Sequence, residues 1–387
     1  AKGESDIGVF YRTGLLLCEG AGGEIYALRD SVTGWPISIP PAGMAVFQPF
    51  AAFDPATSTA LWAVFNVLVA MLAVMCLRSV LATVALDACY SWLAGVFLLL
   101  AGGSLQVGQF SLLFASCWVF ALYLAASRPA LSHLAWAVPA AIKLYPALLF
   151  VAPLCGAKGA KQVTKTAALL IAWLLVLAFA LPMLSYGLRA WDLNVGFVNE
   201  IVLDPSGRVK WMQALGTTAN QSLDAVLIRY LSWYPKFHEK YTSVPTAHMD
   251  LDTVRLLGHI VRLAVIGVTV GFFLRWRRSG SVPFGGEVGS VLLMAALWSS
   301  ALYVALPETR ARYAVYAFLG FVPFAMLVLQ AQEKRARALL MAAFVVVLLL
   351  VVGVMPKPLE VWGVGFLGPL ALWIVSLRAV RQARPAT

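Results

Sequence analysis

Residues 131–154 read LSHLAWAVPAAIKLYPALLFVAPL, an apolar stretch about as long as one membrane span that carries Lys143 near its centre. Pro139 and Pro146 flank this lysine, and a proline inside a helix removes a hydrogen bond and kinks or breaks the rod. The pattern predicts two short half-helices that meet near Lys143 and return the chain to the side it came from. Broken helices at membrane depth occur only where protein buries them or where they line a cavity. We therefore expect Lys143 at the floor of a cavity.

The whole chain has the composition of a membrane protein. Of its 387 residues, 61% are apolar and only 12% are charged, and its mean hydropathy is +0.83. This leaves too little polar surface to cover a soluble globule. Long runs of Ala, Leu and Val with Trp and Tyr near their ends are typical of membrane helices and not of barrel strands. We predict an all-α polytopic membrane protein with spans over residues 57–77, 82–101, 109–127, 131–154, 166–184, 253–274, 287–306, 313–331, 338–355 and 361–377.

Basic residues gather in short loops beside the ends of these spans, and the positive-inside rule places such loops in the cytoplasm. This explains most of the net charge of +11, so we expect no nucleic-acid partner. Helix counting then places residues 1–56, 102–108, 185–252, 307–312 and 356–360 outside. The basic residues that set this orientation are Arg78, Arg128, Lys158, Lys161, Lys165, Arg275, Arg277, Arg278, Lys334, Arg335, Arg337, Arg378, Arg381 and Arg384.

The predicted organisation is a single integral-membrane domain over residues 1–387. Its parts are a first outer loop (1–56), membrane helices (57–184), an outer amphipathic loop (185–252) and C-terminal membrane helices (253–387). The loop 185–252 places several Trp and Tyr residues among Lys and Arg, which suits helices that lie in the headgroup layer. The aromatic residues concerned are Trp191, Trp211, Tyr230, Trp233 and Tyr234.

The cysteines and the N-terminal end give two further expectations. The five cysteines form no CxxC pair, and four lie in or beside apolar runs, so we interpret them as packing residues. The chain opens on polar residues without an initiator Met, and we expect that an N-terminal piece is missing from it.

Two acidic residues stand at the start of the chain, in Glu4-Ser5-Asp6-Ile7-Gly8-Val9-Phe10-Tyr11-Arg12. A carboxylate next to the membrane surface could act as a general base. A solvated loop or a helix cap would explain the same residues. We take Asp6 as the candidate base and Glu4 as its neighbour in the site.

Cations form the second group of candidates. An ionisable side chain within an apolar run indicates function, and a buried ammonium at Lys143 would hold an anion such as phosphate, although a lysine that reaches the headgroups is the alternative. The turn Pro307-Glu308-Thr309-Arg310-Ala311-Arg312 adds two arginines on the outer side, against the positive-inside trend. The rigid guanidinium fork suits phosphate, so we favour a ligand role over a solvated one.

Amide side chains form the third group. Gln106 and Gln109 lie at an outer helix junction among small residues, where they could bind sugar hydroxyls or form part of an ordinary turn. Asn220-Gln221-Ser222 matches a glycosylation sequon, and it could equally start a helix or contact a sugar.

Asp250 and Asp252 resemble a metal-binding DxD pair, but they open a predicted span, where aspartate caps a helix N-terminus. We favour the cap. His238, His248 and His259 show no ligand spacing, and we expect no metal site.

Together these segments resemble the GT-C superfamily of polyprenyl-phosphate-sugar-dependent glycosyltransferases, and most closely glycosyltransferase family 87, the bacterial α-mannosyltransferase-like proteins. Glu4-Ser5-Asp6 resembles the acidic motif of the first outer loop in that superfamily. The segments that resemble motifs of family 87 are Asp6-Ile7-Gly8-Val9-Phe10-Tyr11, Gly108-Gln109, Lys143-Leu144-Tyr145-Pro146 and Asn220-Gln221-Ser222-Leu223.

The sequence departs from the family pattern at two places. Ser111 stands where the family has asparagine, which weakens a sugar contact there. The Ser-Trp-x-His segment of the family is not evident, because Trp298-Ser299-Ser300 leads instead to Pro307-Glu308-Thr309-Arg310. That arginine-containing turn is more similar to other GT-C branches.

The resemblance implies a bundle of about 11 membrane helices, some short or broken, with the site in outer loops. It also implies a first helix before the acidic motif, and we expect that this helix is missing from the chain. It implies an inverting transfer of a hexose, plausibly mannose, from a polyprenyl-phosphate donor to a hydroxyl of a lipid or glycan acceptor. The expected location is the bacterial inner membrane, with the active site on the periplasmic side. No cofactor is expected, although the acidic motif could hold a divalent metal.

In this interpretation Asp6 is the base and Glu4 orients it or the acceptor, while three cations hold the donor phosphate. The remaining polar residues contact the sugar or the acceptor. The phosphate-binding candidates are Lys143, Arg310 and Arg312, and the sugar- or acceptor-binding candidates are Tyr11, Gln106, Gln109, Tyr145, Asn220, Gln221 and Glu308.

Two other classes of protein share some of these features. A lipid-linked glycan ligase or polymerase typically has a large outer loop rich in Arg and His, and the loop 185–252 contains both. A lipid or sugar transporter also uses an intramembrane lysine and broken helices, but it should show repeated halves with matched interruptions, which we do not find.

Overall fold

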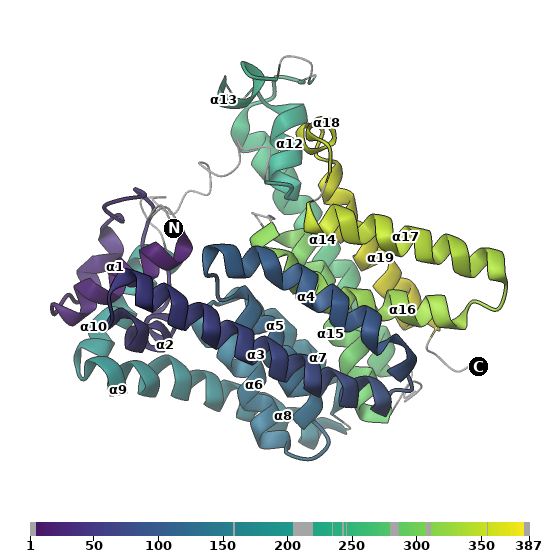
Figure 1. The fold of residues 1–387 in the computed structure, drawn as a ribbon, viewed down its shortest axis with the longest axis horizontal. Coiled ribbons are helices and arrows are strands. Elements are labelled where there is room, and N and C mark those ends of the chain that lie inside the picture. Colours follow the sequence, from purple (N-terminus) through teal and green to yellow (C-terminus); the bar gives the residue numbers. More distant parts are fainter. Residues whose placement is uncertain are drawn as a thin grey trace. The chain divides into compact units, whose positions relative to one another are not determined.

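The computed structural model confirms an all-α polytopic membrane protein (Figure 1). It describes residues 5–157, 159–203, 220–233, 235–241, 244, 246–278, 286–306, 311–353 and 355–382. Within these ranges the regular structure is helical, and strand pairing is limited to one isolated bridge between Arg29 and Pro36. Of the predicted site residues, Glu4, Glu308 and Arg310 lie outside the described ranges.

Eight helical segments of the described chain are long and apolar enough to cross a membrane. Three shorter apolar helices accompany them in the described ranges. The long segments are Pro55–Thr83 (α3), Asp87–Val107 (η2 and α4), Gly159–Tyr186 (α8, η4 and α9), Leu251–Arg277 (in α14), Gly286–Ala305 (α15), Arg312–Gln330 (η6 and α16), Lys334–Val352 (α17) and Val364–Gln382 (η7 and α19), and the shorter ones are Ser111–Leu124 (α5), Pro129–Ile142 (α6) and Tyr145–Gly156 (η3 and α7).

The predicted break in residues 131–154 is confirmed. Helix α6 ends at Ile142, Lys143 has an extended backbone (φ −147°, ψ 136°), and the chain resumes as the 3-10 helix η3 (Tyr145–Phe150) before α7 (Val151–Gly156). The amide of Lys143 still donates to the carbonyl of Pro139 at 2.9 Å, so the last turn of α6 is closed. Pro146 is the second residue of η3, in the first turn, where its missing N–H leaves no helix hydrogen bond unmade.

The segment predicted as the first outer loop contains two α-helices in its described part, residues 5–56. They are α1 (Asp6–Cys18) and α2 (Pro41–Ala51), and the short 3-10 helix η1 (Gly23–Ala27) lies between them. Helix α1 buries Ile7, Phe10 and Leu17, whereas Leu15 on the other side is exposed. The 3.6-residue period of apolar residues that produces this face is short and lies next to a polar end, which hides it in a search for spans.

The described chain divides into two compact units, and each is considered by itself. Unit 1 comprises residues 1–76, 104–150 and 158–210. Unit 2 comprises residues 77–103, 151–157 and 211–387. That the two units together form a single domain stays a prediction.

In unit 1, α1 packs on α2, α5 on α6, and α6 on α8 (Gly159–Leu175). Aromatic rings pack around α2. The centre of the Phe47 ring lies 5.8 Å from that of Phe10 and 5.3 Å from that of Trp62, and the ring centres of Phe110 and Phe10 are 5.0 Å apart. The span that begins with α8 passes through a π-helical turn, η4 (Val176–Ala180), and continues as α9 (Leu181–Tyr186). Helix α10 (Arg189–Phe197) and the π-turn η5 (Val198–Val202) follow, and α10 packs on η1.

Unit 2 is built around α15. Every described side chain from Val288 to Val304 on this helix is buried, and α7, α14 (Leu251–Arg278), η6 (Ala311–Gly320) and α19 (Leu367–Gln382) pack against it. Helix α16 (Phe321–Gln330) packs on α17, and α17 packs on α19. The short helices of this unit are α12 (Leu223–Leu231), α13 (Pro235–His238), α18 (Lys357–Val361), η2 (Asp87–Cys89) and η7 (Val364–Phe366).

The cap predicted at the start of α14 is confirmed. The carboxylate of Asp250 accepts a hydrogen bond from the amide of Thr253 at 2.8 Å, one turn into the helix. Asp252 pairs instead with Arg255 at 2.8 Å on the exposed side of α14. Hydrogen bonding to Thr253 lowers the pKa of Asp250, as expected for a capping carboxylate.

A partly buried ion pair ties α1 to the segment between η1 and α2. The guanidinium of Arg12 donates to both carboxylate oxygens of Asp30, at 2.6 and 2.7 Å. The same carboxylate accepts from the amide and the hydroxyl of Thr33, each at 2.7 Å. Burial alone would raise the pKa of Asp30, but these hydrogen bonds outweigh it and lower the pKa to about 2. Asp30 therefore holds α1 in place as a carboxylate.

Because the folded-state pKa of Asp30 lies below its ordinary value, this carboxylate stabilises the fold above pH 4 and loses its contribution as the pH falls from about 4 to about 2. The contribution at neutral pH is roughly 2 kcal/mol. We expect Asp30→Asn to lower the unfolding temperature at pH 7 by several degrees, and to lower it less at pH 3. Thermal unfolding in detergent at the two pH values measures this, and an equal loss at both would contradict the role of the charge.

Candidate active site

Asp6 is the first residue of α1, and only 8% of its surface is exposed. It precedes most of the free amides of the first turn, where the helix dipole favours negative charge. Ser5 occupies the N-cap position without a hydrogen bond from its side chain to the helix. Asp6 is thus neither a solvated loop residue nor the N-cap, the two alternatives considered from the sequence.

The start of α1 meets the Gly108-Gln109 segment, so two motifs that are a hundred residues apart in the chain come together in unit 1. A Cβ atom added to Gly108 would lie 2.6 Å from the Cβ of Ile7, and the Gly108 backbone is left-handed (φ +71°). One turn further along α1, the ring of Phe10 contacts that of Phe110. Glycine at this turn therefore allows the close approach and the backbone conformation that α1 requires.

The register of α1 on α2 relates Asp6 to Lys143. Phe10 contacts Phe47, and one turn later a Cβ at Gly14 would lie 2.6 Å from the Cβ of Ala51, so the two helices run parallel. One turn earlier, the same register aligns Asp6 with Gly43. A Cβ at Gly43 would lie 3.1 Å from Cγ2 of Ile142, the residue before Lys143. The register thus indicates that Asp6 and Lys143 lie at the same end of α2.

Lys143 is half-buried at the break that follows α6. Its ammonium lies 5.8 Å from the centre of the Tyr145 ring, in a cation–π arrangement, and Tyr145 is also half-buried. Leu144 between them is exposed, so the extended backbone turns alternate side chains to opposite sides. The cavity floor predicted for Lys143 stays a prediction.

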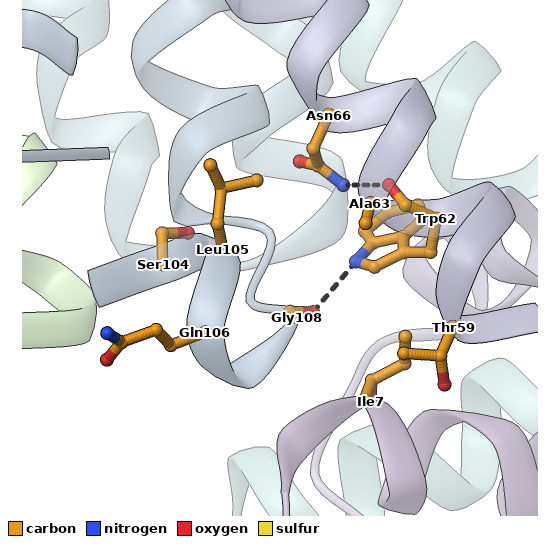
Figure 2. Close-up of a pocket in the computed structure, with 9 residues that line it drawn as sticks. All are labelled: Ile7, Thr59, Trp62, Ala63, Asn66, Ser104, Leu105, Gln106 and Gly108. Carbon is orange, nitrogen blue, oxygen red and sulfur yellow. Dashed lines mark hydrogen bonds between the residues drawn. The ribbon is translucent and has the colours of Figure 1, made fainter. Parts of the chain in front are cut away.

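A small pocket of about 40 Å³ lies beside this part of α1, and Figure 2 shows it. Ile7, Trp62, Asn66 and Gly108 line it, together with the predicted sugar-binding residue Gln106. The indole of Trp62 donates to the carbonyl of Gly108 at 2.9 Å, which joins α3 to the glycine turn. The pocket therefore connects three elements of unit 1 at the place where the motifs meet.

Gln109 is buried behind this turn and only 3% exposed. Its backbone N–H donates to the carbonyl of Ser104 at 3.1 Å, and its side-chain oxygen has no hydrogen-bond partner among the described residues. Ser111, which stands where the family has asparagine, lies 2.8 Å from the hydroxyl of Ser104, Oγ to Oγ. Of the two predicted glutamines, Gln106 lies at the pocket and is exposed, whereas Gln109 belongs to the packed turn.

The predicted sugar contact Tyr11 has another partner in the structure. Its hydroxyl donates to the carbonyl of Phe53 at 3.0 Å, which ties α1 to the segment between α2 and α3. This bond is exposed, so a ligand could still compete for the hydroxyl.

In unit 2, Asn220, Gln221 and Ser222 form the start of α12. The hydroxyl of Ser222 accepts from the amide of Ala225 at 3.2 Å, and the side-chain oxygen of Asn220 accepts from the amide of Ser222 at 3.0 Å. The side chain of Gln221 donates to the carbonyl of Glu360 at 2.8 Å. The segment is therefore a helix start, one of the alternatives considered, and a sugar contact by Asn220 or Gln221 stays a prediction.

Arg229 lies in the same region, and it is not among the residues predicted from the sequence. It is only 1% exposed and donates to the carbonyls of Asn220 and Glu360. Burial lowers its pKa to about 10, opposed by the nearby charge of Glu360, so it stays cationic at neutral pH. A left-handed glycine, Gly363 (φ +72°), brings the backbone close to its guanidinium. One arginine in a short amphipathic helix gives no sign of such burial in the sequence.

Arg312 is half-buried at the start of η6 in unit 2. Its guanidinium lies 5.0 Å from the centre of the Tyr313 ring, which stacks on Tyr316 at 5.9 Å. Ten residues of 3-10 helix are unusual, because this form rarely exceeds one turn, and such stretches often mark functional segments. Within the described residues, no group of three or more His, Cys, Asp or Glu side chains could hold a metal ion.

The helices and the buried polar residues together define a polytopic α-helical integral membrane protein with a candidate site at the start of α1. The chain belongs to glycosyltransferase family 87, because the model of that family matches residues 39–300, more than half of its length. It is therefore a glycosyltransferase, as the motifs predicted. Searches of curated proteins and of solved structures found no match.

The left-handed turn at Gly108 allows a sharp test. We expect Gly108→Ala to destabilise the protein by about 2 kcal/mol, because the new methyl group would overlap Ile7 and the backbone would be strained. Gly102→Ala is the matched control, since a Cβ there meets nothing within 4 Å and lies in helix α4. Thermal unfolding in detergent compares the two variants, and equal stability would contradict the close approach of α1 to this turn.

Proposed function

We propose that this protein is an inverting glycosyltransferase that moves a hexose, with mannose as the proposed sugar, from a polyprenyl-phosphate donor to a hydroxyl of a lipid or glycan acceptor. Membership of glycosyltransferase family 87 supports the class of reaction. The proposed location is the bacterial inner membrane, with the site on the periplasmic side. The observation that carries the proposal is the register that aligns Asp6 and Lys143 at one end of α2.

In the proposed reaction, Asp6 is the general base. The acceptor oxygen attacks the anomeric carbon while its proton passes to the carboxylate of Asp6, and the bond from that carbon to the phosphate oxygen breaks with its electron pair. A single displacement of this kind inverts the anomeric centre. The burial of Asp6 at a helix start supports this role, because a base must be held in place within hydrogen-bond reach of the acceptor. Glu4 is proposed to orient Asp6 or the acceptor.

Departure of the donor lipid leaves one additional negative charge on its phosphate. A fixed cation that meets this charge as it grows stabilises the transition state more than the ground state. Lys143 fits this role, because its ammonium is held at a helix break and is not on a long mobile loop. The resemblance assigns Arg310 and Arg312 to the same phosphate, and these assignments stay proposals. A phosphate leaving group needs no proton donor, so one base suffices, unlike in most glycosidases.

The proposed sugar- and acceptor-binding residues act through hydroxyl and amide groups. Gln106 is supported by its position at the pocket beside Ile7. Tyr145 is supported by its position beside Lys143, where an aromatic ring could cover one face of a sugar. Tyr11, Gln109, Asn220, Gln221 and Glu308 keep their proposed roles from the resemblance. No metal or cofactor is included in the proposal.

The test is transfer from radiolabelled polyprenyl-phosphate hexoses to total membrane lipid in nanodiscs, with and without EDTA. We expect Asp6→Asn to lower the rate by about 10²- to 10⁴-fold, since it removes the base and keeps the shape of the side chain. We expect Lys143→Gln to lower it by about 10²- to 10³-fold through loss of phosphate stabilisation. EDTA should leave the wild-type rate unchanged.

Two exposed residues supply matched controls. Asp87→Asn removes a carboxylate from the start of η2, and Lys165→Gln removes an ammonium from α8, and both should transfer at the wild-type rate. A wild-type rate for Asp6→Asn would refute the proposed base. Passage of labelled lipid across the bilayer without formation of product would favour the transporter alternative.

A further inference from the structure

The pocket beside Ile7 contains a buried hydrogen-bond acceptor that the structure leaves open. Asn66 lies in the membrane-spanning part of α3 and is only 2% exposed. Its side-chain NH₂ donates to the carbonyl of Trp62 at 2.9 Å, which fixes which way the amide faces (Figure 2). Its oxygen has no hydrogen-bond partner among the described residues, and Asn66 lines the pocket. An unpaired amide oxygen is unfavourable in a buried site, so the pocket requires a donor.

The other lining groups do not supply that donor. The indole NH of Trp62 is used by the carbonyl of Gly108. The hydroxyl of Ser104 donates to the carbonyl of Gln109 at 3.2 Å, and it lies 2.8 Å from the hydroxyl of Ser111. The hydroxyl of Thr59 donates to the carbonyl of Pro55 at 2.7 Å. Gln106, the remaining polar lining residue, makes no hydrogen bond to this oxygen either, so the oxygen is left for a donor on a bound molecule.

The charge and the size of the pocket restrict the ligand. None of the residues that line it is charged, which disfavours phosphate and ammonium groups and favours a neutral hydroxyl. Its volume of about 40 Å³ exceeds the ~10–15 Å³ that one water needs, but it is too small for a sugar ring. The hydroxymethyl group is the part of a hexose that stands off the ring on its own carbon, so it can enter where ring hydroxyls cannot.

We propose that this pocket binds the hydroxymethyl arm of a hexose, with Asn66 accepting the hydrogen bond of the primary hydroxyl. Gln106 is exposed at the pocket and could hold the ring, while Ile7 forms a wall of the pocket immediately after Asp6 in α1. The inference rests on the proposed function for the identity of the sugar. The hexose belongs either to the donor or to the acceptor, and the two sources share the same hydroxymethyl chemistry.

The test removes the primary hydroxyl from one substrate at a time. Wild-type protein is assayed with a polyprenyl-phosphate hexose and its 6-deoxy counterpart as donors, and with an octyl hexoside and its 6-deoxy counterpart as acceptors. For the substrate that occupies the pocket, kcat/KM should fall about 10- to 100-fold on loss of the hydroxyl. The arm in which the fall occurs identifies the source of the hexose.

Asn66→Leu keeps the branching of the side chain and removes the acceptor. In this variant the parent and the 6-deoxy substrate should be used at nearly equal rates, because the acceptor of the hydrogen bond from the primary hydroxyl is gone. Ser116→Ala is the matched control: Ser116 is a buried polar residue of α5 without a hydrogen-bond partner among the described residues, and it does not line the pocket. It should keep the wild-type preference.

A second variant covers the case in which Asn66→Leu fails to fold. Ala63 lines the pocket, and Ala63→Val fills part of it without the loss of a polar group. We expect it to lower kcat/KM for the parent substrate to about the value for the 6-deoxy substrate. Equal use of the parent and 6-deoxy forms of both donor and acceptor by wild type would overturn the proposal, and the pocket would then hold water.

A binding measurement separates failure of the pocket from failure of the proposed reaction. Methyl hexoside should raise the unfolding temperature of the wild type more than methyl 6-deoxyhexoside does, and the difference should vanish in Asn66→Leu. If no donor yields product but this difference is present, the proposed function fails and the hydroxymethyl site stands. If transfer proceeds and neither measurement distinguishes the sugars, the site is refuted and the function stands.

Discussion

The structure depends on the hydrogen bonding of its own backbone, because the hydrocarbon core of a bilayer offers no water to an unpaired amide or carbonyl. Every departure from a regular helix within a span therefore needs a partner from the protein. At the break after α6, the backbone N–H of Lys143 still donates a hydrogen bond to the carbonyl of Pro139. In the π-turn η4, the carbonyl of Ala178 accepts from the side chain of Asn194 on α10 at 3.3 Å. At both places a backbone group of the irregular stretch is paired within unit 1.

The candidate site uses the same support. Helix α1 is held by the bidentate pair between Arg12 and Asp30, by aromatic contacts with α2, and by the close approach to Gly108. These contacts hold Asp6 at the start of a fixed helix, so a base would need little reorganisation before proton transfer. Lys143 lies at the end of another helix that packs on α2. One short helix therefore relates the two charged groups that the proposed reaction needs.

The sequence was sufficient for the features that depend on local chemistry. Apolar runs predicted the membrane helices, the two prolines predicted the break at Lys143, and Asp250 was correctly interpreted as a helix cap. Features that depend on packing between distant segments were not predictable. Asn66 is one amide in an apolar span, and only its neighbours make it the acceptor of a pocket. The burial of Arg229 likewise depends on the carbonyl of Glu360, more than a hundred residues away. Helix α1 was missed because its apolar face is short.

Helix α15 has a consequence for how unit 2 is made. A ribosome-bound chain delivers this helix to the membrane before η6 and α19 exist, when only α7 and α14 of its neighbours have been made, so lipid must cover the rest of its surface. In the finished unit the side chains from Val288 to Val304 contact protein, and α19 supplies part of that cover. Lipids that first solvate α15 must therefore leave as later segments arrive. Assembly of unit 2 ends with a desolvation step that cannot be completed until synthesis has passed α19, and until then α15 is open to wrong partners in the bilayer.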